Sequence, residues 1–248
     1  MMADIDLGTE PLTMVGTLDN PYNGNLEGNG HTLTFNPPIN NEKYAAPIQC
    51  VGNATIRNLH TKGSITTTNQ YAAGLVGLIM TNSRPTIENC ISSVNLKSTK
   101  NGEAYIGGLI AIVVTRQDVQ IRNCLFDGSI EGENCNNNGG LVGNSATVVY
   151  ISNCLFAPSR LNTNLDGCET FGPRTWVENS AYLATYGGVP SDNRAIDAKN
   201  MSAAALRDYL GDGWTVSEDK VIPVVHHDAN SFNYLLWDNL AKVVLNID

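Results

Sequence analysis

One short pattern of hydrophobic and polar positions recurs along the chain. It consists of a β-branched residue, any residue, Asn, and then a small or apolar residue, as in Ile56-Arg57-Asn58-Leu59. Successive copies are about 30 residues apart, which is a typical period of solenoid repeats. Five copies carry the pattern, and their asparagines are Asn58, Asn89, Asn123, Asn153 and Asn179.

A second, glycine-rich pattern follows the first in three of these units. It reads Ala73-Gly74-Leu75-Val76-Gly77 in one unit, and its other copies begin at Gly107 and Gly139. Because two linked patterns keep their register over several units, we interpret the chain as a repeat protein. Variable segments between the patterns are typical of surface loops on one side of a stack. Here they fall mainly in residues 66–72, 97–106 and 131–138.

The residue types of the repeat favour strands over helices. Ile, Val and Thr suit strands, and Asn and Gly suit turns, whereas helical repeats need long amphipathic stretches that these units lack. We therefore predict an all-β fold, a parallel β-solenoid whose coils stack about 4.8 Å apart. We expect an inward Ile/Val column, a ladder of Asn side-chain amides at a turn, and a tight glycine corner close to the core.

The Gly-Gly-Leu-Val-Gly segments with a spaced Ile-x-Asn-Cys resemble the GLUG motif of bacterial secreted and cell-surface proteins. The stretch from Tyr22 to Leu33 is similar to the segment that precedes those repeats, so the resemblance covers roughly residues 22–182. It implies a right-handed parallel β-helix in an adhesin-like protein, and it supplies no catalytic residues. Ala111 departs from the motif in place of its closing glycine, and Ala45-Ala46-Pro47-Ile48 replaces it in the first coil.

The ends of a solenoid expose apolar core and open strand edges, so both ends need caps. We expect residues 1–185 to form the β-helix of about five coils, beginning with an N-terminal strand cap. We expect residues 186–248 to form an α+β cap packed on the last coil. Ser202 and Gly211 predict the two ends of a short helix. Two strands are expected near 214–216 and 221–224, and helical spacing is seen over 231–244.

The six cysteines fall into two kinds of position. Cys90, Cys124 and Cys154 share one repeat position, directly after the repeated asparagine. This equivalence predicts small buried side chains in a ladder, because a buried free cysteine packs as a small hydrophobe. Cys135 and Cys168 lie shortly before equivalent glycines, so we expect their loops to be neighbours, with either a disulfide or two free thiols.

Composition and charge exclude several classes of protein. The net charge is −9 and no Lys/Arg cluster is present, which argues against nucleic-acid binding. No apolar run approaches the ~20 residues that span a bilayer. No cofactor, metal or catalytic residue is predicted, because metal-ligand spacing, a phosphate loop and a nucleophile elbow are all missing. The first residues lack a signal peptide, so we expect a secreted or cell-surface protein that has lost it, or alternatively a cytosolic one.

Tyr71 and Tyr105 occupy equivalent positions before Gly74 and Gly108, and they are the candidates for ligand binding. An aromatic pair beside Asn-rich loops suits sugar rings; the alternative is that both tyrosines only close a loop over the coil. The sequence favours a non-catalytic adhesin-like or scaffold protein, a monomer or part of a larger surface protein, with glycans or host surface proteins as partners. The alternatives are a carbohydrate-active β-helix enzyme (a lyase or glycosidase) and a passive spacer.

Overall fold

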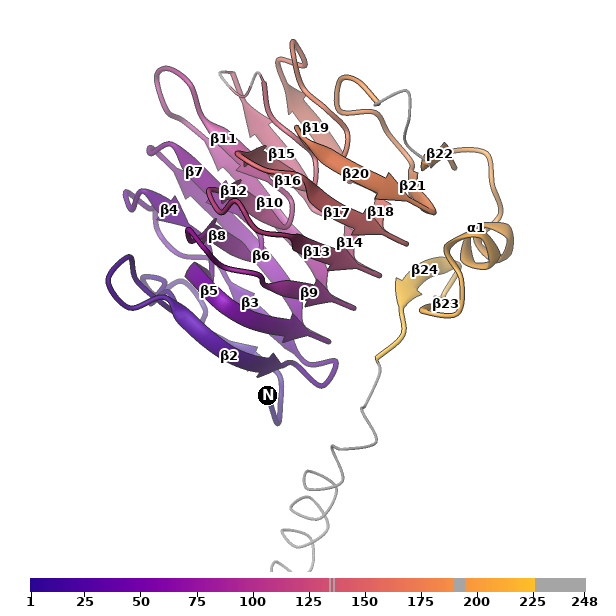
Figure 1. Cartoon of the computed structure of the whole chain (residues 1–248), viewed down its shortest axis with the longest axis horizontal. Helices are drawn as coiled ribbons and strands as arrows, with labels where there is room; N and C mark the ends of the chain where they lie inside the picture. Colours follow the sequence, from indigo (N-terminus) through magenta and orange to yellow (C-terminus); the bar gives the residue numbers. More distant parts are fainter. Residues whose placement is uncertain (134, 136, 190–194, 226–248) are drawn as a thin grey trace, which may run out of the picture.

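Parallel strands stack coil upon coil through most of the chain, as Figure 1 shows. The computed structural model describes residues 1–133, 135, 137–189 and 195–225. It is a β-solenoid of about five turns, with 48% of residues in strands and 4% in helix. The predicted fold class is therefore confirmed.

The first long sheet, called sheet A, runs the whole length of the solenoid. All its neighbouring strands are parallel. In spatial order it contains β1 (Ile5–Asp6), β3 (Thr32–Phe35), β6 (His60–Thr67), β10 (Ile91–Ser98), β14 (Leu125–Phe126) with β15 (Ser129–Gly132), β18 (Leu155–Phe156) with β19 (Arg160–Thr163), β21 (Ser180–Tyr182) and β22 (Ala195–Asp197).

Two further sheets complete each coil. Sheet B forms a second long face, and the short sheet C joins the two faces on the loop side. Sheet B contains β2 (Tyr22–Glu27), β5 (Ile48–Arg57), β8 (Val76–Ile79), β9 (Thr86–Glu88), β12 (Ile110–Val113), β13 (Val119–Arg122), β16 (Val142–Ser145), β17 (Val149–Ser152) and β20 (Thr175–Glu178), and sheet C contains β4 (Tyr44–Ala45), β7 (Tyr71–Ala73) and β11 (Tyr105–Gly107).

The β-branched position of the repeat points into the core. The five residues at this position pair in register from coil to coil across sheet B, and each is at most 1% exposed. This confirms the predicted inward column, which supplies much of the apolar burial that stabilises the stack. Its members are Ile56, Ile87, Ile121, Ile151 and Val177.

The repeated asparagines form the corner between sheets B and A. All five have a left-handed backbone, with φ from 44° to 53°, a conformation that Asn tolerates better than most residues. The predicted amide ladder is only partly correct. Asn123 donates its side-chain amide to Asn89, but the Asn58 amide donates to the carboxylate of Glu27 instead. The backbone conformation is therefore what all five positions share.

The paired glycines form the predicted tight corner for a steric reason. A Cβ on Gly108 would lie 2.4 Å from the ring of Phe126 and 2.8 Å from the carbonyl oxygen of Gly140. A Cβ on Gly140 would lie 2.2 Å from the carbonyl oxygen of Thr170. Because the next coil and the core aromatic residue come this close, the corner excludes any side chain.

The two ends differ in how they are covered. At the N-terminal end, β1 adds a parallel strand beside β3, which confirms the expected strand cap. At the C-terminal end, β22 pairs with β21, and the buried Tyr186 contacts the ring of Phe156 with 6.4 Å between the centroids. These two features cover the last coil.

The C-terminal helix and hairpin form as expected. The side chain of Ser202 accepts a hydrogen bond from the backbone of Ala205 at the start of α1 (Ala203–Leu210), and β23 (Trp214–Ser217) pairs antiparallel with β24 (Lys220–Pro223).

This unit packs along the side of the solenoid (Figure 1), and its apolar cluster includes Ala181 of the last coil together with residues of the two coils before it. The Trp214 indole donates to the carbonyl oxygen of Asn153 at 2.9 Å. The reason is a row of outward-facing apolar residues on successive coils, which would be exposed to solvent without this unit. The outward row contains Leu125, Leu155 and Ala181.

The expected helix over 231–244 lies outside the described residues.

Candidate functional site

A polar groove of about 770 Å³ opens on the loop side of the solenoid. It is lined by residues 97–101, 131–133 and 162–164, which are the ends of β10, β15 and β19 and the segments that follow them. Two of these segments begin the variable loops that the sequence placed on one side of the stack. The groove therefore spans three successive coils.

Strand register brings the groove side chains together. Lys97 of β10 pairs with Glu131 of β15, and Glu131 pairs with Asn162 of β19. Glu131 also forms an ion pair with Arg160, with 3.4 Å between Oε1 and Nη1. Because the backbone ladder fixes the register of these three rows, neighbouring side chains of the groove floor lie at the spacing of strands, about 4.8 Å.

Almost every residue that lines the groove carries a polar side chain. Lys97 and Lys100 are balanced by Glu131 and Glu133, and Gly132 is the single residue of the lining without a polar side chain. Typical pockets for drug-like molecules are mostly apolar, so this lining favours a ligand with many hydrogen-bonding groups. The neutral polar residues of the lining are Ser98, Thr99, Asn101, Asn162, Asn164 and Thr163, whose hydroxyl oxygen is buried.

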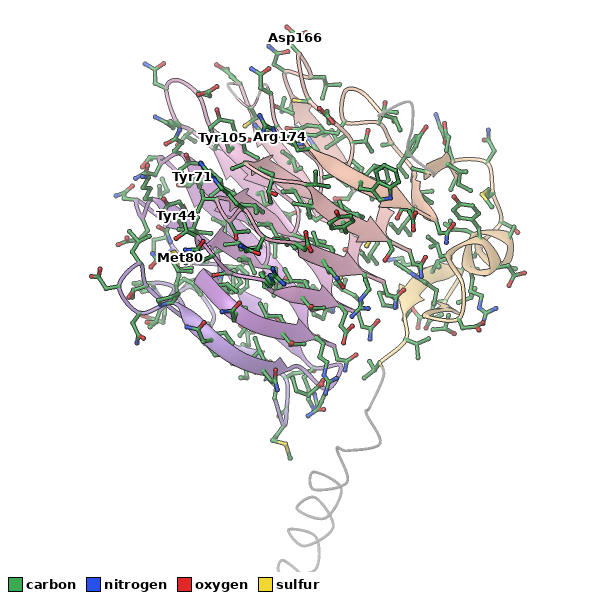
Figure 2. All side chains as sticks on the ribbon, in the orientation of Figure 1. Tyr44, Tyr71, Met80, Tyr105, Asp166 and Arg174 are labelled. Carbon is green, nitrogen blue, oxygen red and sulfur yellow. The ribbon has the colours of Figure 1, made fainter. Side chains whose placement is uncertain are left out.

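The predicted aromatic pair belongs to a column of three stacked rings, seen in a row at the edge of the solenoid in Figure 2. The ring centroids of Tyr44 and Tyr71 are 5.1 Å apart, and those of Tyr71 and Tyr105 are 5.6 Å apart. The sequence missed Tyr44 because the first coil lacks the glycine motif, although Tyr44 directly precedes the segment that replaces it. Burial, and then contact with Glu103, raises the pKa of Tyr105 to about 12.

This tyrosine column has the properties of a structural ladder. Each ring uses a face to contact its neighbour, and Tyr71 also packs against a small buried cluster of Ala46, Ala73 and Ala111. Sugar stacking needs an open ring face. The column therefore supports the interpretation that these tyrosines close the corner, and Tyr71 and Tyr105 remain weaker candidates for binding than the groove.

The three repeated cysteines are buried at the corner, as predicted. The thiol of each donates to the carbonyl oxygen two residues earlier, for example from Cys124 to Arg122 at 3.1 Å. Ser180 makes the same contact with its hydroxyl in the next coil. Burial raises the pKa of Cys90 and Cys124 well above that of a free thiol. These cysteines, with Cys154, are structural.

Cys135 and Cys168 are neighbours, as the sequence suggested, and both are free thiols in the structure. The Cys168 thiol donates to the backbone carbonyl of Cys135 at 3.2 Å. Both side chains are buried, and burial raises the pKa of Cys135 to about 11. Of the two arrangements that the sequence allowed, the structure has the two free thiols.

A hydrogen-bonded chain of His60, Ser93 and Asp127 crosses neighbouring strands of sheet A. The hydroxyl stands between the imidazole and the carboxylate, whereas a nucleophilic triad places the imidazole in the middle. Burial lowers the pKa of His60, which favours its neutral form. The arrangement links three coils by polar contacts, and in it the Ser93 hydroxyl donates to Asp127 and not to the imidazole.

Within the described ranges, no three His, Cys, Asp or Glu side chains are grouped to hold a metal ion, and no helix there is long and apolar enough to cross a membrane. The chain matches no protein-family model, no curated protein and no solved structure.

Proposed function

We propose that the protein is a non-catalytic, adhesin-like β-solenoid of the secreted or cell-surface class that binds a neutral glycan in the polar groove. The observation that carries this proposal is the groove lining, in which hydroxyl, amide and charged groups from three coils converge. The resemblance to GLUG-motif proteins supports the surface location.

The balance of charge in the groove favours a neutral glycan over an acidic one. Lys97 and Lys100 offset Glu131 and Glu133, and the chain carries a net charge of −9, which repels polyanions. Charged groups still form strong hydrogen bonds with sugar hydroxyls. A neutral polysaccharide lying across the three strand ends would exchange water for these contacts.

The groove carboxylates also bear on the alternative, a carbohydrate-active enzyme. Glycoside hydrolysis usually needs two facing carboxyl groups, one of them protonated as the acid. Glu131 and Glu133 lie on one strand end, and the guanidinium of Arg160 pairs with Glu131. Two carboxylates at one strand end do not face each other across a bound chain, so binding is favoured over cleavage.

Affinity electrophoresis of the full chain in gels containing xylan, galactomannan or mixed-linkage β-glucan tests this proposal. Polygalacturonate serves as the polyanion control. We expect at least one neutral glycan to retard the chain, and the double variant Lys97→Ala/Asn162→Ala to bind about tenfold more weakly, which corresponds to roughly 1.4 kcal/mol of lost hydrogen bonding. Lys62→Ala, an exposed lysine of sheet A outside the groove, is the matched control.

Three results would overturn the proposal. The first is that no glycan of the panel retards the chain. The second is that the double variant binds as tightly as the unchanged protein. The third is that incubation with the bound glycan produces new reducing ends or unsaturated products, which would establish the enzyme alternative.

A further inference from the structure

An exposed aromatic pair lies on sheet B, away from the groove. Tyr150 of β17 and Trp176 of β20 are register partners on neighbouring parallel strands. Their side chains are 44% and 49% exposed, while the next residues, Ile151 and Val177, are buried in the core. The alternation of strand side chains therefore points both aromatic residues outward.

The surroundings of this pair are polar, which makes its exposure unusual. The outward row of sheet B continues from Tyr150 to Gln120 and Thr86, and then to Thr55. Single exposed apolar residues are common on protein surfaces. Two large aromatic residues that occupy adjacent places in an otherwise polar row are a different case, because each leaves apolar area in water that a partner could bury.

The ring faces of this pair are not used within the described part of the chain. The stacked ring pairs there are made by other residues, including the column of Tyr44, Tyr71 and Tyr105. The Trp176 indole donates to Glu178 Oε1 at 3.2 Å. This contact is made at the ring edge and holds the ring in one orientation, so a face remains available for stacking.

In the charged row beside the pair, the alternation of acidic and basic residues stops at this point. Glu27 pairs with Arg57 at 2.6 Å, and Glu88 pairs with Arg122 at 3.0 Å. In the next coil Ser152 stands where another glutamate would continue the alternation, and Glu178 follows where an arginine would stand. The carboxylate of Glu178 therefore faces a hydroxyl in its row and not a guanidinium.

We propose that Tyr150 and Trp176 form a platform for an extended, neutral, β-linked polysaccharide. The apolar faces of successive pyranose rings stack on the two aromatic rings, and equatorial hydroxyls bond to Glu178, Ser152 and Gln120. Neighbouring strands are about 4.8 Å apart, close to the length of one sugar unit in an extended β-linked chain. Adjacent units of one chain therefore meet adjacent aromatic residues.

A protein partner fits this surface less well. Stable protein interfaces bury at least ~1,200 Å² in total and centre on a larger apolar patch. Here the two aromatic residues border a polar row of Thr86 and Gln120 and a row of ion pairs. Two stacking rings with hydroxyl and carboxylate neighbours suit a narrow polysaccharide chain.

The platform does not depend on the groove, because the two are built from different sheets. Affinity electrophoresis in hydroxyethylcellulose, with amylose as the α-linked control, tests it on the full chain. We expect Trp176→Ala and Tyr150→Ala to weaken retardation about tenfold each, the effect of roughly 1.4 kcal/mol of stacking. Trp176→Phe keeps a ring and should retain most of the binding. Thr86→Ala, in the same outward row, is the matched control.

The outcomes separate the two sites. Retardation that Trp176→Ala reduces and Lys97→Ala/Asn162→Ala does not would support the platform. The platform proposal is wrong if hydroxyethylcellulose does not retard the unchanged protein, or if Trp176→Ala binds it as tightly as the unchanged protein does. This holds whatever glycan the groove binds. Equal retardation in amylose would overturn the stated preference for an extended β-linked chain. Because Trp176 is half exposed, unchanged thermal midpoints should confirm that its variants fold.

Discussion

The side-chain amide of Asn123 donates to the side-chain oxygen of Asn89 in the preceding coil, over 3.1 Å. Both residues have a left-handed backbone, with φ of 50° and 52°. Glycine would adopt this backbone at least as easily, but it would lose the bond between coils. The pair shows why a solenoid corner can favour asparagine, which tolerates the turn and still offers an amide.

Replacing Asn153 tests the backbone requirement of the corner. Its φ is 52°, so we expect Asn153→Ala to lower the free energy of unfolding by about 1–2 kcal/mol, the cost of a left-handed residue with a Cβ. Asn153→Gly should lose less than half as much, because glycine adopts this backbone freely. Urea unfolding measures both, and equal losses in the two variants would show that the backbone conformation is not the cause.

The glycine corner makes a sharp steric prediction. In Gly108→Ala the new Cβ would meet the Phe126 ring at 2.4 Å, and we expect a loss of about 1–3 kcal/mol or more from overpacking. Gly188→Ala is the matched control, because its Cβ would have no neighbour closer than 3.7 Å. Thermal unfolding should separate the two variants clearly. Equal midpoints would contradict the close approach of the coils.

The cysteines should react only slowly with thiol reagents in the folded protein. All six are free and buried, and the pKa of Cys135 is raised to about 11 by burial, so very little reactive thiolate exists near pH 8. We expect a thiol reagent to label none of them quickly under native conditions and all six after denaturation. An intact mass that reveals a disulfide between Cys135 and Cys168 without reductant would contradict this arrangement.

The tyrosine column predicts a loss of stability at high pH. The pKa of Tyr105 is about 12 in the folded chain, raised chiefly by burial, and about 10 in an unfolded one. Between these values the unfolded state has released the proton and the folded state has kept it, so stability is full below pH 10 and falls as the pH rises toward 12. The urea midpoint of Tyr105→Phe should fall less over this range. Identical pH profiles would contradict the burial of this phenol.

Most of the coil architecture could be predicted because each coil repeats the same physical demands. The inward Ile/Val column, the left-handed corner and the close glycines recur in the sequence at one period. The place of the C-terminal unit could not be predicted in the same way. Leu125-Phe126 and Leu155-Phe156 show that one residue of each pair must point outward, but they do not identify what covers it.

The candidate sites were harder to find than the fold. Lys97, Glu131 and Asn162 resemble ordinary loop residues in the sequence, and only the strand register brings them into one groove. Tyr150 and Trp176 did leave a signal, because each directly precedes a core position of the repeat. An aromatic residue at that outward place indicates an exposed ring. The repeat pattern pointed instead to Tyr71 and Tyr105, which stack with Tyr44 in the structure.

Hydrogen exchange of backbone amides tests glycan binding in the groove most directly. The probe is a soluble oligosaccharide of whichever panel glycan binds, added to the Trp176→Ala variant so that the platform does not contribute. We predict slower exchange confined to residues 97–101, 131–133 and 162–164, the segments that line the groove. Unchanged exchange in these segments, with protection elsewhere or none at saturating oligosaccharide, would contradict the account.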